Sequence, residues 1–401
     1  MVEPMRILWI LPYLPWPATS GGKTRQLHLL RTLNSQGFKI TLLVQSKQAL
    51  DVAAQQALEP YLEKLIVLPR RSIKHPLTLL RVVFGKLPIL ACVNGFSKPL
   101  ENIFSNVLLE HWDIIQVEHS YSFQPYDKLL KAADKPFILT EHNLESSLGG
   151  ATYGRFPKIF KPLIVFDQWR ARAWEKYVFA RAQRLIAVTE ADAHNMRNLT
   201  KTPVDVVVNG VDTASFAVVK PDFEASAILF VGNYDYPPNV DAINWALTEI
   251  MPLVWDTCPT ARFIVAGFAL PAEWSQRWVD KRIVWKGFVE DLPKLQSQSS
   301  VFLAPLRHGG GSKLKVLEAL AAGLPLVSTG QGVSGLSIED EDAYLYGEGA
   351  QQLATQVCRV LKHTSIAHRL STAGRSYVQL NHDWSIAAGQ LRTVYQRCKE
   401  A

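Results

Sequence analysis

The segment from Pro305 to Thr329 carries the residue types best suited to bind a phosphate group. An apolar run, 301–305, leads into three consecutive glycines, and a helix-forming stretch begins at Lys313. Glycine lets a ligand approach the backbone closely, and the free N–H groups at a helix N-terminus attract phosphate. Ser312 is a suitable N-cap, and Gly323 is a suitable residue for the helix end. Three cations accompany the glycines and favour a diphosphate ligand: Arg307, Lys313 and Lys315.

Glu318 follows Lys315 by three residues, which is close to one helical turn, so the two side chains share a helix face. A carboxylate would repel phosphate, but it can accept hydrogen bonds from two sugar hydroxyls, as acidic residues do for ribose in dinucleotide-binding folds. The alternative is a flexible glycine loop followed by a solvated glutamate. The coincidence of glycines, cations and an acid within a dozen residues favours a binding site.

Other enzyme classes are excluded by missing motifs. His308 and the three glycines spell the oxyanion loop of lipases, but the chain has no Gly-x-Ser-x-Gly nucleophile elbow. No Walker loop and no Gly-x-Gly-x-x-Gly follows an expected strand, which argues against a P-loop enzyme and a dehydrogenase. The acidic run 338–342 has an Asp-x-Asp spacing that could bind a metal, but it is typical of a solvated loop. We therefore expect no metal and no cofactor.

Short apolar runs alternate with helix-like stretches along the whole chain, as parallel sheets flanked by helices require. They predict two doubly wound α/β units in series. In the first half the expected strands are Arg6–Leu11, Lys39–Val44, Leu65–Leu68, Ile114–Glu118, Phe137–Thr140 and Leu185–Val188. In the second half they are Asp205–Val208, Ala227–Val231, Arg262–Ala266, Ile283–Lys286, Val301–Ala304 and Pro325–Ser328.

The segment Thr200–Asp205 interrupts the pattern with a proline and polar residues, and this predicts a boundary. We expect an N-terminal domain over 1–200, a nucleotide-binding domain over 201–382 and a C-terminal helix within 383–401. Ligands of such sheets bind at the carboxyl ends of the strands. We therefore expect the site in a cleft between two facing sheets.

Composition sets further bounds. A chain of 401 residues exceeds one ordinary core, and its four cysteines are widely spaced, as in a reducing compartment. The prolines in the apolar N-terminal segment argue against a signal peptide, and no apolar stretch approaches the roughly 20 residues of a spanning helix. Residues 1–200 carry a charge balance of +9 and residues 201–401 one of −2. The basic half suits an anionic partner such as a membrane surface, a lipid diphosphate or a polyanion, although a solvated basic surface is the alternative.

With these motifs the chain resembles family 4 of the retaining glycosyltransferases. The resemblance covers nearly the whole sequence, and its motifs occur in the family's order. The most specific is the 305–329 segment, and the YPPNVDA and GGG-x-K-L-K variants are most similar to bacterial exopolysaccharide-assembly enzymes. The other matching segments are Ser20–Gln26, Ala187–Asp192, Val208–Phe216, Ile228–Trp245 and Lys286–Leu292.

The resemblance implies the GT-B architecture, with two Rossmann-like domains and a C-terminal helix that crosses back to the N-terminal domain. It also implies roles for individual residues. His142 would contact the transferred sugar or the leaving group, and we expect it to act in catalysis with Lys313 and Arg307. Glu118 and His119 are candidates to orient the acceptor. The expected donor-binding residues are Gly21, Gly22, Gly232, Asn233, Phe288, Val289, Gly310, Gly311, Lys315 and Glu318, with Arg25 near the diphosphate.

Two features depart from the family pattern. Most members hold a second acid that seven residues separate from the position of Glu318, where this chain has Gly310. Many also place an Arg and a Lys after the strand that ends near Gly232, and this chain supplies neither. We infer that Arg307, Lys313 and Lys315 replace that charge.

The resulting expectation is a cytoplasmic, metal-independent hexosyltransferase that acts in bacterial exopolysaccharide or biofilm assembly with retention of configuration. It would use a nucleotide-diphosphate sugar, with GDP-mannose as the first guess, and a glycan or lipid-linked acceptor. Two alternatives stay open: a GT-B-fold nucleotide-sugar epimerase, and a non-catalytic subunit that binds a nucleotide sugar. Two basic amphipathic stretches, Arg70–Lys86 and Phe160–Arg184, also predict peripheral contact with an anionic membrane, or else solvated basic faces of core helices.

Overall fold

The computed structural model describes residues 4–47, 49–72, 74–94, 98–147, 161–310 and 313–400. The chain forms two compact units, each of which is described below by itself. The first comprises Met1–Val208 together with Ala387–Ala401, and the second comprises Asn209–Ile386.

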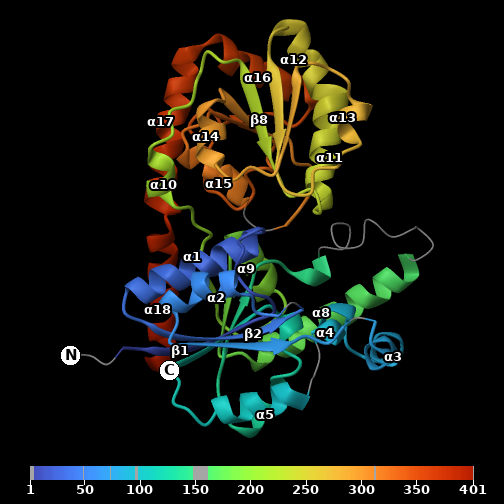
Figure 1. Ribbon diagram of the computed structural model, residues 1–401, viewed down its shortest axis with the longest axis vertical. Helices are drawn as coiled ribbons and strands as arrows, with labels where there is room; N and C mark the ends of the chain where they lie inside the picture. Colours follow the sequence, from blue (N-terminus) through green and yellow to red (C-terminus); the bar gives the residue numbers. More distant parts are fainter. Residues whose placement is uncertain are drawn as a thin grey trace. The chain divides into compact units, whose positions relative to one another are not determined.

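The first unit is built on a parallel sheet of seven strands in the order β3-β2-β1-β4-β5-β6-β7. Its central strands are buried almost throughout, because helices cover both faces (Figure 1). The strands are β1 (Arg6–Leu11), β2 (Lys39–Ser46), β3 (Lys64–Pro69), β4 (Ile114–Glu118), β5 (Ile138–Glu141), β6 (Arg184–Ala187) and β7 (Val204–Val206).

The helices of this unit bury apolar side chains against the sheet. One cluster joins Leu8 and Ile10 of β1 to Phe104, Leu130 and Phe179, which lie on three of the helices. The helices are α1 (Gly21–Ser35), α2 (Val52–Leu58), α3 (Pro76–Phe84), α4 (Ile89–Val93), α5 (Lys98–Val107), α6 (Asp127–Ala132), α8 (Lys161–Arg181), α9 (Glu190–Arg197) and α18 (Trp384–Glu400), with 3-10 turns η1 (Glu59–Tyr61), η2 (Ser120–Ser122) and η3 (Glu145–Ser147).

The C-terminal helix α18 packs on the first unit, as the fold expected from the sequence requires. Tyr395 is fully buried, and its hydroxyl donates to Oε1 of Gln116 on β4 at 2.5 Å. At its last turns, Arg397 pairs with Asp205 at 2.7 Å and Lys399 with Asp113 at 2.6 Å.

The second unit contains a parallel sheet of six strands in the order β10-β9-β8-β11-β12-β13. In Figure 1, α11 and α13 lie on one side of β8, and α10, α14, α15 and α17 lie on the other. The strands are β8 (Ala227–Val231), β9 (Arg262–Ala266), β10 (Ile283–Gly287), β11 (Val301–Ala304), β12 (Leu326–Ser328) and β13 (Leu345–Tyr346). The helices are α10 (Thr213–Ala217), α11 (Pro237–Trp245), α12 (Met251–Thr257), α13 (Trp274–Arg277), α14 (Leu292–Ser297), α15 (Leu314–Ala321), α16 (Ala350–Lys362) and α17 (Thr364–Asn381), with the π-helical turn η5 (Ala246–Ile250) between α11 and α12.

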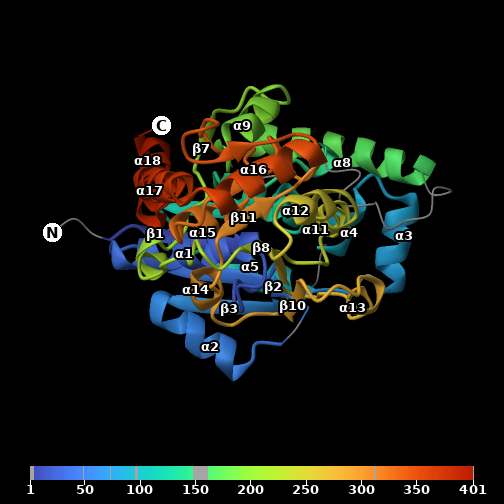
Figure 2. The same cartoon turned by 90° about the horizontal axis from the view of Figure 1, so that it is seen from above.

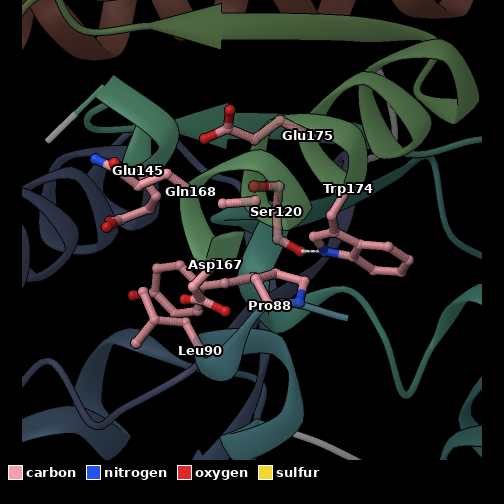
Figure 3. Close-up of a pocket in the computed structure, with 10 residues that line it drawn as sticks. Pro88, Leu90, Ser120, Glu145, Asp167, Gln168, Trp174 and Glu175 are labelled. Carbon is pink, nitrogen blue, oxygen red and sulfur yellow. Dashed lines mark hydrogen bonds between the residues drawn. The ribbon is translucent and has the colours of Figure 1, made fainter. Parts of the chain in front are cut away.

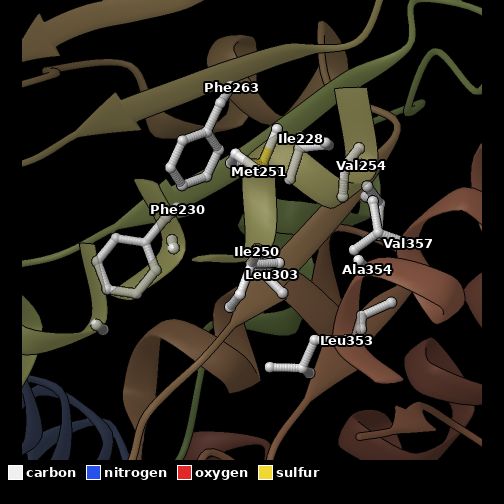
Figure 4. Packing of buried hydrophobic residues seen from close by; sticks show 14 of the residues in the cluster. Ile228, Phe230, Ile250, Met251, Val254, Phe263, Leu303, Leu353, Ala354 and Val357 are labelled. Atoms are coloured by element: carbon white, nitrogen blue, oxygen red, sulfur yellow. The ribbon is translucent and has the colours of Figure 1, made fainter. Parts of the chain in front are cut away.

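Apolar side chains fill both faces of the second sheet. Figure 4 shows the face where Ile228, Phe230 and Leu303 of the strands meet Ile250 and Met251, and all five are fully buried. On the opposite face Leu317 and Leu320 of α15 pack against Phe302. Packing on both faces of the sheet therefore fixes the positions of the carboxyl ends of the strands and of the loops that follow them.

Most expected strands agree with the structure to within two residues at each end, and one was assigned to the wrong sheet. The expected strand Asp205–Val208 is β7, which pairs with β6 and completes the first sheet. Residues up to Val208 therefore belong to the first unit rather than the second. Strand β13 was not predicted, because two residues carry too little pattern to be recognised.

Each sheet reverses its strand order at one point, between β1 and β4 in the first and between β8 and β11 in the second. Ligands of doubly wound sheets bind beside the carboxyl ends of the strands at such a switch point. In each unit the candidate residues follow these strands.

Candidate functional site

In the first unit the candidate residues follow β1, β4 and β5. Tyr13 comes after β1, His119 after β4 and His142 after β5, while α1 begins at Gly21. Because parallel neighbouring strands end at the same edge, these side chains come together. The rings of His119 and His142 are 4.4 Å apart, centroid to centroid.

Glu118 and His142 form a buried pair. Oε2 of Glu118 lies 2.7 Å from Nε2 of His142, and Oε1 accepts hydrogen bonds from Trp9 Nε1 at 2.9 Å and Gln116 Nε2 at 2.7 Å. Glu118 is 1% exposed and His142 is 8% exposed. The structure therefore corrects the expected role of Glu118: its carboxylate is engaged inside the unit and cannot orient an acceptor.

His119 lies beside this pair in a strained backbone conformation, with φ of 66°. Its Nε2 is 3.3 Å from the hydroxyl of Tyr13, and its Nδ1 is 3.7 Å from Oε2 of Glu141. A non-glycine residue in the left-handed region costs conformational energy and is frequent at functional sites. His119 is 6% exposed.

Gly22 brings the backbone of α1 up to these side chains. A Cβ atom at this position would lie 2.7 Å from the Tyr13 hydroxyl and 3.1 Å from His142 Nδ1. A larger residue would displace one of them, so glycine is required here. Gly21, at the start of the helix, is exposed.

Arg25 is buried behind this edge rather than exposed on it. It is 2% exposed, and its guanidinium donates to the carbonyl oxygen of Val208 at 2.8 Å. Burial lowers its pKa to about 10. The expectation that Arg25 approaches a diphosphate is therefore wrong: it ties α1 to the end of the first unit.

A small cavity of about 20 Å³ lies between η2 and α8 (Figure 3). Trp174 Nε1 donates to the carbonyl of Ser120 at 2.9 Å across one side of it. Two glutamates are among the other residues that line it. Burial raises the pKa of Glu145 to about 8 and that of Glu175 to about 7. A space of this size holds about one water molecule, which is too little for a sugar ring.

In the second unit the glycine loop follows β11 and leads into α15. Gly309 has a φ of 124°, and a Cβ there would meet the Tyr236 hydroxyl at 3.0 Å. The N–H of Gly310 faces the same hydroxyl at 3.3 Å. Gly311 and the expected N-cap Ser312 lie outside the described residues; α15 begins at Leu314 with Lys313 in the N-cap position.

Lys313 is 7% exposed and turns its ammonium towards the loop. Its Nζ is 3.0 Å from the carbonyl oxygen of Gly310, 3.5 Å from that of Gly309 and 3.3 Å from the hydroxyl of Ser334. Gln331 also donates to the Gly309 carbonyl, at 2.6 Å. The Lys313 ammonium therefore lies against the backbone of the glycine loop.

Lys315 and Glu318 share one face of α15, as the spacing predicted. Burial and the charge of Lys313 lower the pKa of Lys315 to about 7, and burial raises that of Glu318 to about 7. Lys315 donates to Asn239 Oδ1 and lies 4.6 Å above the ring of Phe230. The Lys315 ammonium is thus held beside α11.

Arg307 carries no uncompensated charge. Its guanidinium forms a two-point ion pair with Asp241 of α11, with Nε 3.0 Å from Oδ2, and lies 5.0 Å from the ring centre of Trp245. The side chain is 46% exposed, so a ligand could still reach its outer edge. Of the three expected cations, Lys313 has the most direct contact with the glycine loop.

Neighbouring strands complete this edge. A Cβ at Gly232 would lie 3.0 Å from the ring of Phe230, and the carbonyl of Asn233 accepts from Asn239 Nδ2 at 2.7 Å. Phe288 follows β10 and is 64% exposed, whereas Val289 packs partly into the core. Tyr13, Tyr236 and Asn239 were not predicted to belong to a site. Tyr236 and Asn239 lie within the motif YPPNVDA, and this motif was the one feature of the sequence that could have indicated them.

Two family profiles match the chain. The profile of Glycosyltransferase Family 4 matches residues 19–215, and that of Glycosyl transferases group 1 matches residues 225–363. The chain belongs to glycosyltransferase family 4. The two matches fall mainly on the first and the second unit, so the glycosyltransferase carries both characteristic domains.

The sequence matches to known relatives cover nearly the whole glycosyltransferase. An uncharacterised 44.6 kDa protein of the cps region of Klebsiella pneumoniae is 23% identical, over 94% of this chain and 96% of its own. Glycogen synthase of Mycobacterium tuberculosis is 24% identical, over 98% of this chain and 95% of its own.

Solved structures show the same fold. Anabaena HepE, crystallised with UDP and glucose, superposes with a TM-score of 0.70 at 15% identity and covers 98% of this chain and 99% of its own. The glycosyltransferase thus has the GT-B fold of two Rossmann-like domains, which confirms the fold expected from the sequence. The roles of single residues stay predictions.

Proposed function

We propose that this glycosyltransferase transfers a hexose from a nucleotide-diphosphate sugar to a glycan or lipid-linked acceptor, with retention of configuration, in surface polysaccharide assembly. The second unit would bind the donor and the first unit the acceptor. The observation that carries the proposal is the β11–α15 connection: a glycine loop, Lys313 and Glu318 at the switch point of the second sheet.

Each part of this connection suits one part of the donor. Lys313 and the loop N–H groups would offset the charge of the leaving diphosphate, and fixed charges of this kind are usually the largest contribution to catalysis. Glu318 would accept hydrogen bonds from the ribose hydroxyls. Exposed Phe288, at the end of β10, would lie against the base. We propose that these groups act without a metal ion.

Two relatives support the choice of donor and pathway. The HepE structure contains UDP and glucose, which makes UDP the first nucleotide to test and GDP the second. The Klebsiella relative comes from a cps region, which supports a role in capsule or exopolysaccharide assembly.

The first test is a thermal-shift panel with UDP, GDP, ADP and dTDP. We expect one nucleotide to raise the melting temperature, since a ligand at 100 times its Kd stabilises the folded state by about 2.7 kcal/mol. The matching nucleoside without phosphates is the control and should give a much smaller shift. If no diphosphate stabilises the protein, the proposal is wrong.

Product analysis separates the alternatives. Incubation of the donor alone should leave it largely intact, and addition of a saccharide acceptor should release the nucleoside diphosphate. Release or a changed sugar without an acceptor would favour an epimerase. Tight donor binding without turnover across a broad acceptor panel would favour a non-catalytic subunit.

We also propose that the protein binds anionic membranes through α3 and the first half of α8. Among the described residues, nine of the eighteen exposed large hydrophobic side chains lie on these two segments: Leu77, Leu79, Leu80, Val83, Phe84, Leu163, Val165, Phe166 and Trp169. We call this set the α3–α8 surface. Arg170 joins the segments by donating to the carbonyls of Val82 and Gly85, and Figures 1 and 2 show them at the same end of the first unit.

Charge and hydropathy both suit a bilayer surface. Basic residues adjoin the α3–α8 surface, and each contributes about 1 kcal/mol near an anionic leaflet: Lys74, Arg81, Lys86, Lys161, Arg172 and Lys176. Within the part of the chain that the structure describes, no helix has the length and hydropathy to span a bilayer. Binding would therefore be peripheral.

Flotation with liposomes tests the α3–α8 surface. At low salt, the protein should float with vesicles containing phosphatidylglycerol and much less with pure phosphatidylcholine. The double variant Phe84→Glu with Trp169→Glu should lower the floating fraction at least tenfold, because two apolar contacts become charged. Val279→Glu, at a position 87% exposed in the second unit, is the matched control and should float like the wild type. Equal flotation of the double variant would overturn the assignment.

A further inference from the structure

The carboxylate of Glu118 is surrounded by donors in the interior of the first unit. Trp9 and Gln116 both donate to Oε1, while Oε2 faces His142 Nε2 at 2.7 Å. An indole N–H can only donate. The amide of Gln116 is oriented as well, because its oxygen accepts from the hydroxyl of Tyr395 and its nitrogen also faces Thr140 Oγ1 at 3.1 Å.

These contacts determine which atom of the pair carries a proton. Burial alone would raise the pKa of Glu118, but the hydrogen bond with His142 and nearby positive charge bring it to about 2. Burial and the neighbouring His119 lower the pKa of His142 to about 4. At neutral pH an ionised carboxylate therefore faces a neutral imidazole, and the proton between them belongs to Nε2.

We propose that Glu118 is a positioning residue that holds His142 as its Nε2–H tautomer, so that Nδ1 presents a lone pair beside Gly22 and accepts a hydrogen bond from a hydroxyl of the transferred sugar. The tautomer follows from the contacts of Glu118 together with its ionised state. The sugar rests on the proposed function.

The surroundings of Nδ1 agree with this role. It points to the first turn of α1, where a Cβ on Gly22 would lie 3.1 Å from it and 2.7 Å from the Tyr13 hydroxyl. An unprotonated ring nitrogen can accept from a hydroxyl, but it has no proton to donate to a phosphate oxygen. Of the two roles that the family resemblance left open for His142, the contact with a sugar hydroxyl is therefore favoured over the contact with the leaving group.

Glu118→Gln tests the proposal with little change in shape. Trp9 and Gln116 would retain the side-chain oxygen of the new amide, so its NH₂ group would face His142 Nε2. That nitrogen would then have to accept, and the imidazole would switch to the Nδ1–H tautomer. The variant thus changes Nδ1 from a hydrogen-bond acceptor to a donor, while the side chains of Trp9, Gln116 and His142 stay in place.

Long-range ¹H–¹⁵N correlation spectra of protein labelled at histidine nitrogen report the tautomer directly. We expect an Nε2–H pattern for His142 at pH 7 in the wild type and an Nδ1–H pattern in Glu118→Gln, with the signals assigned from their absence in His142→Gln. Glu145→Gln, a carboxyl-to-amide change beside the small cavity, should retain the wild-type pattern. An Nδ1–H wild type, or an unchanged tautomer in Glu118→Gln, would overturn the proposal.

Kinetics give a second readout. Glu118→Gln should lower kcat at least tenfold, while the affinity for the free nucleoside diphosphate stays within twofold of the wild type. A purely structural effect would instead lower the melting temperature and leave kcat per folded molecule unchanged, which would contradict the positioning role. If the tautomer switches as expected but no donor is turned over by the wild type, the proposed function fails and the assignment of Glu118 stands.

Discussion

Glu318→Ala should weaken binding of the nucleoside diphosphate at least 100-fold and leave the second unit folded. The carboxylate would accept two ribose hydroxyls, and hydrogen bonds to charged groups contribute roughly 1.5 to 3 kcal/mol each. Glu318 lies on α15 and is not among the residues fully buried in the core, so its loss opens no large core cavity. Titration calorimetry with the nucleotide that gives the largest thermal shift would measure the change.

The pH dependence of binding provides an internal check. Burial raises the pKa of Glu318 to about 7, so the fraction of carboxylate increases as pH rises from 6 to 8. Lys315 also has a pKa of about 7 and loses its charge over the same range, so the Glu318 effect is read from the ratio of wild-type to Glu318→Ala affinity. Because the ionised carboxylate is the stronger acceptor, this ratio should increase from pH 6 to 8 by up to about tenfold.

A matched control separates this effect from a general change of charge. Glu224 is exposed and precedes β8, at the opposite edge of the same sheet. Glu224→Ala removes the same group from the same unit and should change affinity less than twofold. Equal nucleotide affinity in Glu318→Ala and wild type would show that the ribose is held elsewhere.

The elements of the fold were predictable because buried parallel strands are continuous apolar runs. Arg6–Leu11 and Val301–Ala304 have the bounds that their sequences predict. The position of β7 was not predictable. Its three residues are all half-buried, and nothing in them indicates that the partner is β6. Pairing of so short a strand depends on contacts that form only in the folded unit.

The edge residues of the site were predictable by the same logic, but their partners were not. That Glu118 and His142 follow adjacent strands is visible in the sequence. That Glu118 turns inward depends on Trp9 and Gln116, which offer it two donors. A side chain at a strand end can face the ligand or the interior, and local sequence does not distinguish the two.

The charge of the donor edge shows the same limit. Arg307 and Asp241 are 66 residues apart, and only the packing of α11 against the loop brings them into an ion pair. From composition, Arg307 counts as an uncompensated positive charge, whereas in the structure Asp241 neutralises that charge. The loop is consequently less positive than its sequence suggests, and Lys313 is the expected cation with the most direct contact with it.

Tyr395→Ala should destabilise the first unit by about 3 to 5 kcal/mol, the range for removal of a large buried side chain. Tyr395 is fully buried, its ring is 6.1 Å from that of Phe38, and Leu391 and Val394 of α18 are buried beside it. At 2 to 4 °C per kcal/mol for a unit of this size, the melting transition of the first unit should fall by roughly 10 °C. Calorimetry would record it, and the nucleotide-dependent transition of the second unit should change little.

Two variants on the same helix separate packing from hydrogen bonding. Arg392→Ala, at an exposed position, should stay within about 0.5 kcal/mol of the wild type. Tyr395→Phe keeps the ring and removes only the hydroxyl that orients Gln116, so it should cost about 1 to 3 kcal/mol. It should also loosen the amide that donates to Glu118, and the His142 tautomer should become mixed. If Tyr395→Ala melts like Arg392→Ala, α18 does not stabilise the first unit, and the hydrogen-bonded path from the C-terminal helix to His142 has no energetic role.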